Sequence, residues 1–194
     1  MFPDKPRRRV HGHHDRRMDG LHDLVVRAPG MSVIDIGMNR GLNAYEMMDA
    51  GARLVHGCDL APDCVTFARE MFADLDPFSC QSQFEVVDLT KGITAFAPFG
   101  DAGWDIVLFI GVYHKLKRAP SKPYLDLGAT PMSAEELSQL MTDLGRRTNR
   151  YMGLRIGLED VPQIDADLHT AGLRRVALSE ISALGSTAIY RREH

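Results

Sequence analysis

Two hydrophobic periods alternate along the chain. Short runs of β-branched and other apolar residues, which predict strands, recur at residues 32–36, 53–60, 83–89, 104–110, 150–156, 174–179 and 186–191. Between them, apolar residues at helical spacing predict helices at 16–27, 42–50, 62–72, 133–147 and 161–171. Ser133 and Glu136 have capping-box spacing, which marks the start of the fourth helix. Residues 91–103 are expected to hold a short helix, and residues 115–131, with three prolines, to form a loop.

This alternation predicts a doubly wound α/β fold, because strand–helix–strand units join parallel strands through right-handed crossovers. The run at 104–110 is the most apolar, as expected at the centre of a parallel sheet. The last two strands are joined by a short connection, which favours a hairpin. The sequence therefore predicts a seven-stranded, mostly parallel sheet with a C-terminal antiparallel hairpin strand.

The N-terminus differs from the rest of the chain. Residues 1–15 lack apolar periodicity, and six of the 23 basic residues fall within the first 17 positions, against two acids. We therefore expect a basic arm at 1–15 and a single domain at 16–194.

The arm offers two further possibilities. It could be a solvated arm, or it could cover a ligand, with Arg16 or Arg17 reaching a carboxylate or phosphate. A cluster of possible metal ligands is formed by His11, His13, His14 and Asp15. Such close-set residues in an arm make a poor preformed cage, so no metal site is expected.

Composition indicates an ordinary globular protein. The net charge of −3 does not suggest a broad basic surface for nucleic acid, and three cysteines are an odd number for a disulfide framework. The first residues lack the apolar core of a signal peptide, and the longest apolar run, 106–112, is too short to span a bilayer. We expect a cytoplasmic protein with reduced thiols and no membrane association.

Candidate chemistry begins at the end of the first strand, because ligands of such sheets lie outside the carboxyl ends of the strands. Gly37 and Gly41 would allow a tight turn close to a ligand, although their G-x-x-x-G spacing differs from the dinucleotide fingerprint. Asp35 would repel a pyrophosphate, which disfavours a nicotinamide-dependent oxidoreductase. Its carboxylate suits a ligand that carries an ammonium and a sulfonium, such as S-adenosylmethionine.

Acidic residues are also expected at the ends of the next two strands. Asp59 could accept hydrogen bonds from ribose hydroxyls, or cap the helix that Pro62 opens. Asp88 could meet the exocyclic amine of adenine, with Leu89 beside the ring, or cap the segment that follows it. Their order, each at a successive strand end, favours a nucleoside-containing ligand.

Four segments resemble the motifs of class I S-adenosylmethionine-dependent methyltransferases. They are V-I-D-I-G-M-N-R-G at 33–41, G-C-D-L at 57–60, F-E-V-V-D-L at 84–89 and W-D-I-V-L-F-I-G-V-Y-H-K-L at 104–116. The resemblance covers residues 30–194, and the G-V-Y-H-K-L end is similar to a subset that includes a wobble-uridine tRNA-modifying enzyme and sugar-modifying methyltransferases. The N/D-P-P-Y/F motif of amino-methylating DNA enzymes is missing, which argues against DNA-base methylation.

The resemblance implies a Rossmann-like fold and S-adenosylmethionine as cofactor. It implies that Gly37, Asn39 and Gly41 line the methionine moiety, with Met38 between them in the first motif. Asp59, followed by Leu60, would bind the ribose, and Asp88 and Leu89 would bracket the adenine. Ile110, Gly111 and the residues after them would face the transferring methyl group.

His114 is the candidate general base, because an imidazole of near-neutral pKa can take a proton from an acceptor. Tyr113 is the second candidate; alternatively both residues pack over the cofactor or hold the loop. We expect methyl transfer to an oxygen or nitrogen of a small-molecule or glycan acceptor, bound by the arm and residues 115–131. The alternatives are an RNA acceptor, favoured by the basic residues of that loop, and a cofactor-binding module without catalysis.

Overall fold

The computed structural model describes residues 18–74, 80–118, 122–181 and 185–193. The basic arm expected at 1–15, its histidines, and Arg16 and Arg17 lie outside these residues. The strands are β1 (Ser32–Ile36), β2 (Leu54–Asp59), β3 (Gln81–Val86), β4 (Trp104–Ile110), β5 (Thr148–Ile156), β6 (Leu173–Ile181) and β7 (Gly185–Arg192).

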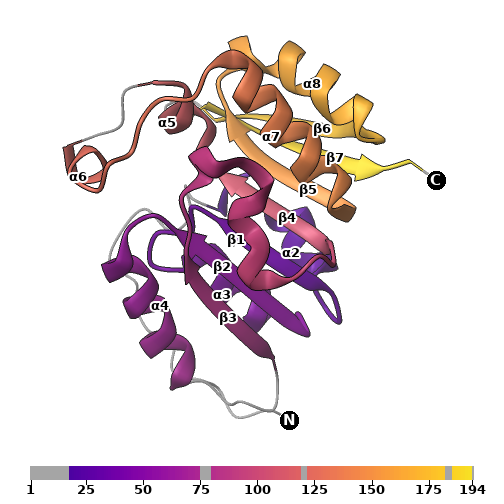
Figure 1. Ribbon diagram of the computed structural model, residues 1–194. Helices are drawn as coiled ribbons and strands as arrows, with labels where there is room; N and C mark the ends of the chain where they lie inside the picture. Colours follow the sequence, from indigo (N-terminus) through magenta and orange to yellow (C-terminus); the bar gives the residue numbers. More distant parts are fainter. Residues whose placement is uncertain (1–17, 75–79, 119–121, 182–184, 194) are drawn as a thin grey trace.

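The strands form one seven-stranded sheet in the order β3-β2-β1-β4-β5-β7-β6 (Figure 1). The first five strands of this order are parallel to one another, and β7 is antiparallel to both β5 and β6. The doubly wound sheet with its C-terminal hairpin is thus confirmed. The strand order reverses between β1 and β4, and at such a switch point the carboxyl ends leave a crevice for a ligand.

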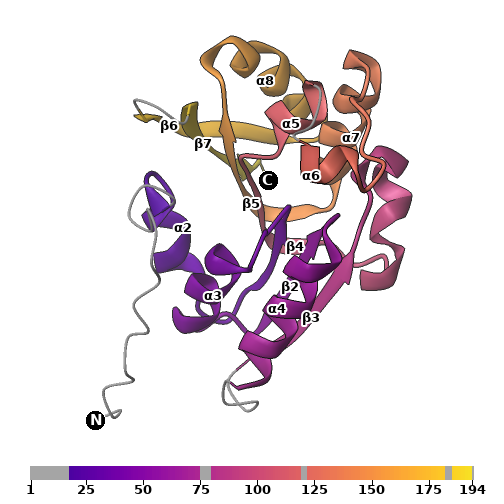
Figure 2. The same ribbon diagram turned by 90° about the vertical axis from the view of Figure 1, so that its left-hand side faces the viewer.

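Helices cover both faces of the sheet (Figures 1 and 2). One apolar cluster is contributed by the sheet and by α2 (His22–Arg27), α3 (Leu42–Asp49) and α4 (Pro62–Ala73). The other involves the 3-10 helix η1 (Leu89–Phe99), α5 (Tyr113–Lys117), α7 (Ala134–Arg146) and α8 (Val161–Thr170). The short helices α6 (Lys122–Leu125) and η2 (Leu158–Asp160) follow α5 and β5, respectively.

Local signals explain where several elements start. Ser133 and Glu136 form the predicted capping box: the Glu136 amide donates to Ser133 Oγ, and the Ser133 amide donates to Glu136 Oε2. Pro62 occupies the first turn of α4, where its missing N–H costs nothing. No described helix is long and apolar enough to cross a bilayer.

Several element boundaries differ from the sequence-based expectations by a few residues. The first helix, predicted for 16–27, is interrupted by a turn at 19–21, where Gly20 has a φ of +74°, and α2 begins at His22. The third strand, predicted for 83–89, spans Gln81–Val86: its last register pair is Val86 with Asp59, where β2 ends. The Val87 amide still donates to the Asp59 carbonyl, at 3.0 Å. The segment predicted as a loop at 115–131 contains the end of α5 (Tyr113–Lys117) and the short helix α6 (Lys122–Leu125).

Candidate functional site

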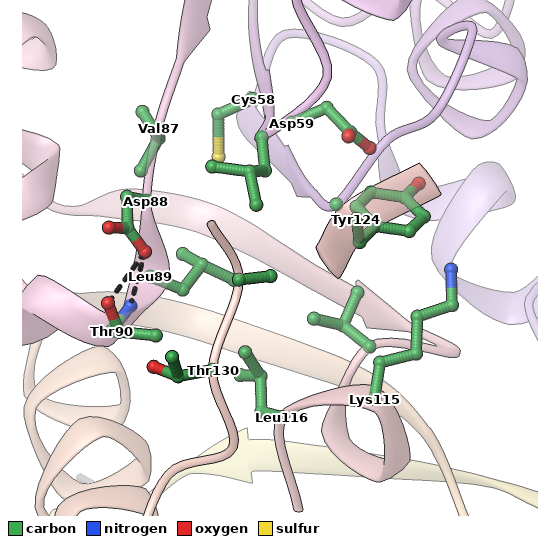
Figure 3. A pocket seen from close by; sticks show the side chains of 14 residues that line it. Cys58, Asp59, Val87, Asp88, Leu89, Thr90, Lys115, Leu116, Tyr124 and Thr130 are labelled. Atoms are coloured by element: carbon green, nitrogen blue, oxygen red, sulfur yellow. Dashed lines mark hydrogen bonds between the residues drawn. The ribbon is translucent and has the colours of Figure 1, made fainter. Parts of the chain in front are cut away.

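A cavity lies at the carboxyl end of the sheet, where β1, β2 and β3 deliver their following loops (Figure 3). Water-sized molecules have about 70 Å³ of it to occupy, and the empty space with the open mouth included is about 600 Å³. The residues that line it are Gly37, Cys58, Asp59, Leu60, Val87, Asp88, Leu89, Thr90, Val112, Lys115, Leu116, Tyr124, Ala129 and Thr130.

The turn after β1 needs residues that tolerate positive φ. Gly37 has a φ of +67°, and an added Cβ there would overlap a methyl group of Val112 on the opposite wall. Asn39, at φ 54°, is the one positive-φ residue other than glycine in the described ranges 18–74, 80–118, 122–181 and 185–193. Gly41 is also left-handed, at φ +79°, and immediately precedes α3. The backbone of the predicted first motif therefore turns tightly beside the cavity.

Asp59 holds this turn from the end of β2. Its carboxylate is buried and accepts hydrogen bonds from the backbone amides of Asn39, at 2.9 Å, and Ala61, at 3.0 Å. Each carboxylate oxygen has a further lone pair. Because Asp59 also lines the cavity, its carboxylate has access to a ligand hydroxyl. The alternative prediction, that Asp59 caps α4, is wrong: the N-cap is Ala61, and no side chain caps the helix.

Asp35 and Met38 support the turn without lining the cavity. Asp35 is buried, and its carboxylate accepts a hydrogen bond from the Ala44 amide in the first turn of α3, at 3.2 Å. The Met38 amide donates to the Cys58 carbonyl, and its sulfur packs against Gly57, where a side chain would leave no room. Asp35 and Met38 thus hold the turn after β1 in place, while Gly37 of this turn lines the cavity.

The β3 side of the cavity is apolar with one acid. Val87, Leu89 and Leu60 supply hydrocarbon walls. Asp88 lies two residues beyond β3, and its Oδ1 accepts hydrogen bonds from the amide of Thr90, at 3.1 Å, and from its hydroxyl, at 2.7 Å. The cap predicted as an alternative for Asp88 is therefore present, and the same residue lines the cavity.

The far wall comes from residues that were not predicted to line a cofactor site. Lys115 and Leu116 of α5 face the cavity, and so do Tyr124 of α6 and the chain at 129–130. The Lys115 ammonium lies 5.1 Å from the centre of the Tyr124 ring. Burial, followed by the nearby Asp59 and Cys64 charges, raises the pKa of Tyr124. The sequence signal that could have identified Tyr124 is its position as an aromatic residue in the segment after β4.

The two predicted catalytic residues point in different directions. Tyr113 is 5% exposed within the core, where burial and then the charges of Asp160 and Asp167 raise its pKa to about 12. His114 is exposed on α5. Partial burial of its imidazole, followed by the positive charges of Lys115 and Arg118, lowers its pKa, and the negative charge of Asp160 opposes this shift.

Eight predicted site residues lie outside the cavity wall. Four of them belong to the first motif: Asp35, Met38, Asn39 and Gly41. Neither His114 nor Tyr113 lines the cavity, and neither do Ile110 and Gly111 at the end of β4. The catalytic role of the first two and the methyl-facing role of the last two remain predictions.

The arrangement suits a nucleoside: a carboxylate for hydroxyl groups, apolar walls for a base, and a glycine turn that allows close approach. Within the described part of the chain, no group of three His, Cys, Asp or Glu residues could hold a metal ion. The cavity-lining Cys58 is buried, and burial raises the pKa of its thiol, so it stays protonated. The site favours binding and positioning over metal or thiolate chemistry.

Several solved structures with a similar fold are named as methyltransferases. The magnesium protoporphyrin IX methyltransferase (ChlM) of Synechocystis PCC 6803, with bound S-adenosylmethionine, is 19% identical at a TM-score of 0.67, covering 93% of this chain and 80% of that one. The N-methyltransferase NodS of Bradyrhizobium japonicum WM9 is 10% identical at 0.63, covering 93% and 97%. The ribosomal protein L11 methylase of Lactobacillus delbrueckii subsp. bulgaricus is 17% identical at 0.59, covering 89% and 78%.

No family model matches the sequence, and no curated protein matches it. The similarity therefore rests on structure, at identities that establish the fold. The sheet order, the helices on both faces and the terminal hairpin agree with the resemblance of the four motifs. The chain has the fold of the class I S-adenosylmethionine-dependent methyltransferases.

Proposed function

We propose that this protein is an S-adenosylmethionine-dependent methyltransferase that modifies an oxygen or nitrogen of a small-molecule or glycan acceptor. The observation that carries the proposal is the position of Asp59. Its buried carboxylate ends β2, fixes the glycine turn and lines the cavity beside apolar walls. This is the place where an acidic residue receives ribose hydroxyls in sheets of this kind.

The residues present fit the cofactor. Asp59 would hold the ribose, Leu60 and Leu89 would enclose the adenine, and the turn at 37–41 would receive the methionine part. When bound, the cofactor supplies an electrophilic methyl group on a sulfonium. The protein's part is then to align an acceptor atom in line with that methyl group and to exclude water, and alignment alone can remove much of a barrier.

His114 is the group we propose for proton removal. It lies one helical turn after β4, near the expected position of the methyl group, and its lowered pKa keeps the imidazole neutral at pH 7. The proposal of a small acceptor is supported by a similar structure named as a magnesium protoporphyrin IX methyltransferase.

Calorimetric titration with S-adenosylmethionine and S-adenosylhomocysteine tests the proposal. Wild-type protein should bind both ligands in the micromolar range, and Leu60→Glu should abolish binding, because it places a charge on an apolar wall of the cavity. Asp59→Asn should weaken binding, although the change also alters the hydrogen bonds of the turn.

The matched control is Val26→Glu, at a residue that is 78% exposed on α2 and outside the cavity; it should bind like the wild type. Circular dichroism checks that each variant is folded. Absence of binding by folded wild-type protein would contradict the proposal. Binding without turnover on any acceptor would favour the non-catalytic alternative.

An RNA acceptor is the second candidate, because Lys115 and Lys122 are exposed next to the cavity on α5 and α6. Of the other cations there, Lys117 pairs with Asp160 and Arg118 with Glu159, which reduces the field available to phosphates. RNA binding whose affinity falls steeply with salt would favour this candidate.

A further inference from the structure

One wall of the cavity is an aromatic ring with a cation on it. Tyr124 of α6 is half-buried and lines the cavity, and the Lys115 ammonium lies 5.1 Å from its ring centre. Among the residues that the structure describes, no carboxylate forms an ion pair with this ammonium. The ring therefore already holds a positive charge at the edge of the proposed cofactor site.

The ring lies at the end of the cavity that would receive the charged part of the cofactor. Figure 3 shows Tyr124 and Lys115 on the side away from Asp88 and Thr90. Figure 3 also shows Tyr124 on the same side of the cavity as Asp59. With adenine at the Leu89 end and ribose at Asp59, the amino-acid part with its sulfonium continues toward Gly37 and the ring. This step rests on the proposed function.

The faces of aromatic rings attract cations that are weakly hydrated, as in the recognition of quaternary ammonium groups. The sulfonium of S-adenosylmethionine is such a cation, whereas the sulfur of S-adenosylhomocysteine is neutral. We infer that Tyr124 is a specificity-determining residue that makes the cavity prefer the sulfonium cofactor over its neutral thioether product. Loss of the positive charge on methyl transfer then weakens the hold on the product and favours its exchange for fresh cofactor.

By the same geometry, Lys115 competes with the sulfonium for the Tyr124 ring. Its ammonium occupies the ring that the sulfonium would contact, and two positive charges at one ring repel each other. Removal of the ammonium should therefore raise affinity for the sulfonium ligand more than for the neutral one.

The test is the ratio of the two dissociation constants, measured by calorimetry for S-adenosylmethionine and S-adenosylhomocysteine. Tyr124→Leu should weaken binding of the first by about 3- to 30-fold relative to the second, the range of a cation–π contact. Tyr124→Phe keeps the ring and should keep the wild-type ratio. An unchanged ratio in Tyr124→Leu, or an equal loss in Tyr124→Phe, would overturn the inference.

Two further variants separate the explanations. Leu125→Ala changes the exposed neighbour on α6 and should leave the ratio as in the wild type, so a change there would show that any disturbance of α6 alters it. Lys115→Met should raise the preference for S-adenosylmethionine, and an unchanged or lower preference contradicts the competition.

The two proposals fail differently. If wild-type protein binds neither ligand, the proposed function is wrong and this inference falls with it. If wild-type protein binds both, Leu60→Glu binds neither and Tyr124→Leu keeps the wild-type ratio, the function stands and the role of Tyr124 is wrong.

Discussion

The two ends of the parallel strands, called here the amino edge and the carboxyl edge of the sheet, are built in opposite ways. At the amino edge, the Trp104 indole donates to His56 Nδ1 at 3.0 Å, and the Arg147 guanidinium lies 4.5 Å from the Trp104 ring. Phe99 stacks on His56 with ring centres 4.8 Å apart. At the carboxyl edge, Asp35 and Asp59 bond to backbone amides and leave a cavity between the loops. One edge is closed by side chains packed on one another, and the other is held open by carboxylates.

This difference assigns separate tasks to the two edges. Large buried rings with satisfied polar groups contribute stability, because their burial removes apolar surface from water. A loop fixed through its backbone amides keeps its shape without filling the space beside it. Stability and binding should therefore respond to different substitutions.

The largest expected effect is on stability, at the amino edge. Trp104 is 1% exposed, so Trp104→Ala should lower the free energy of unfolding by about 3–5 kcal/mol. Urea denaturation followed by circular dichroism measures it, and Leu60→Glu should change the midpoint much less. Trp104→Phe is the milder variant, which retains a ring and loses the indole donor. Equal stability losses in Trp104→Ala and Leu60→Glu would break the distinction between the edges.

An intermediate effect is expected at the turn after β1. Gly37→Ala should destabilise the protein by about 1–3 kcal/mol and weaken cofactor binding, because the new methyl group overlaps Val112 and φ is positive. Gly30→Ala is the matched control: its φ of +72° is similar, but nothing lies within 4 Å of an added Cβ. The difference between the two, in melting and in calorimetry, isolates the overlap. Identical behaviour would show that only backbone strain matters.

The smallest effect is a pH dependence at the amino edge. Burial, and then the Arg147 charge, lower the pKa of His56. The unfolded chain therefore takes up a proton first on acidification, and stability falls as the pH drops from the unfolded pKa, about 6.5, through the lower folded pKa. One group changes stability by at most about 1.4 kcal/mol per pH unit.

Unfolding at pH 7 and below, monitored by the chain's single tryptophan, measures this dependence. His56→Asn should flatten the acid limb of the stability profile. An unchanged profile in this variant would place the titrating group elsewhere.

The sequence predicted the fold well wherever local signals agree with packing. The runs at 32–36 and 104–110 became β1 and β4 without change, because strands that are buried on both faces are mostly apolar and stand out in the sequence. The third strand was drawn too long, since its end depends on where β2 stops, which is a tertiary contact.

The site was predicted in part, for a similar reason. Gly37, Asp59, Leu60, Asp88 and Leu89 line the cavity as expected, because residues after parallel strands meet at one edge. Tyr124 was missed, because its approach depends on how residues 122–131 fold back over that edge. No short-range pattern reports such a return of the chain.

A crystal structure of the protein with S-adenosylhomocysteine tests the central claim most directly. The account predicts ribose hydroxyls on the Asp59 carboxylate, adenine between Leu60 and Leu89, and the amino-acid part toward Gly37. A ligand bound outside this cavity, or a cavity that stays empty at saturating ligand, would contradict it.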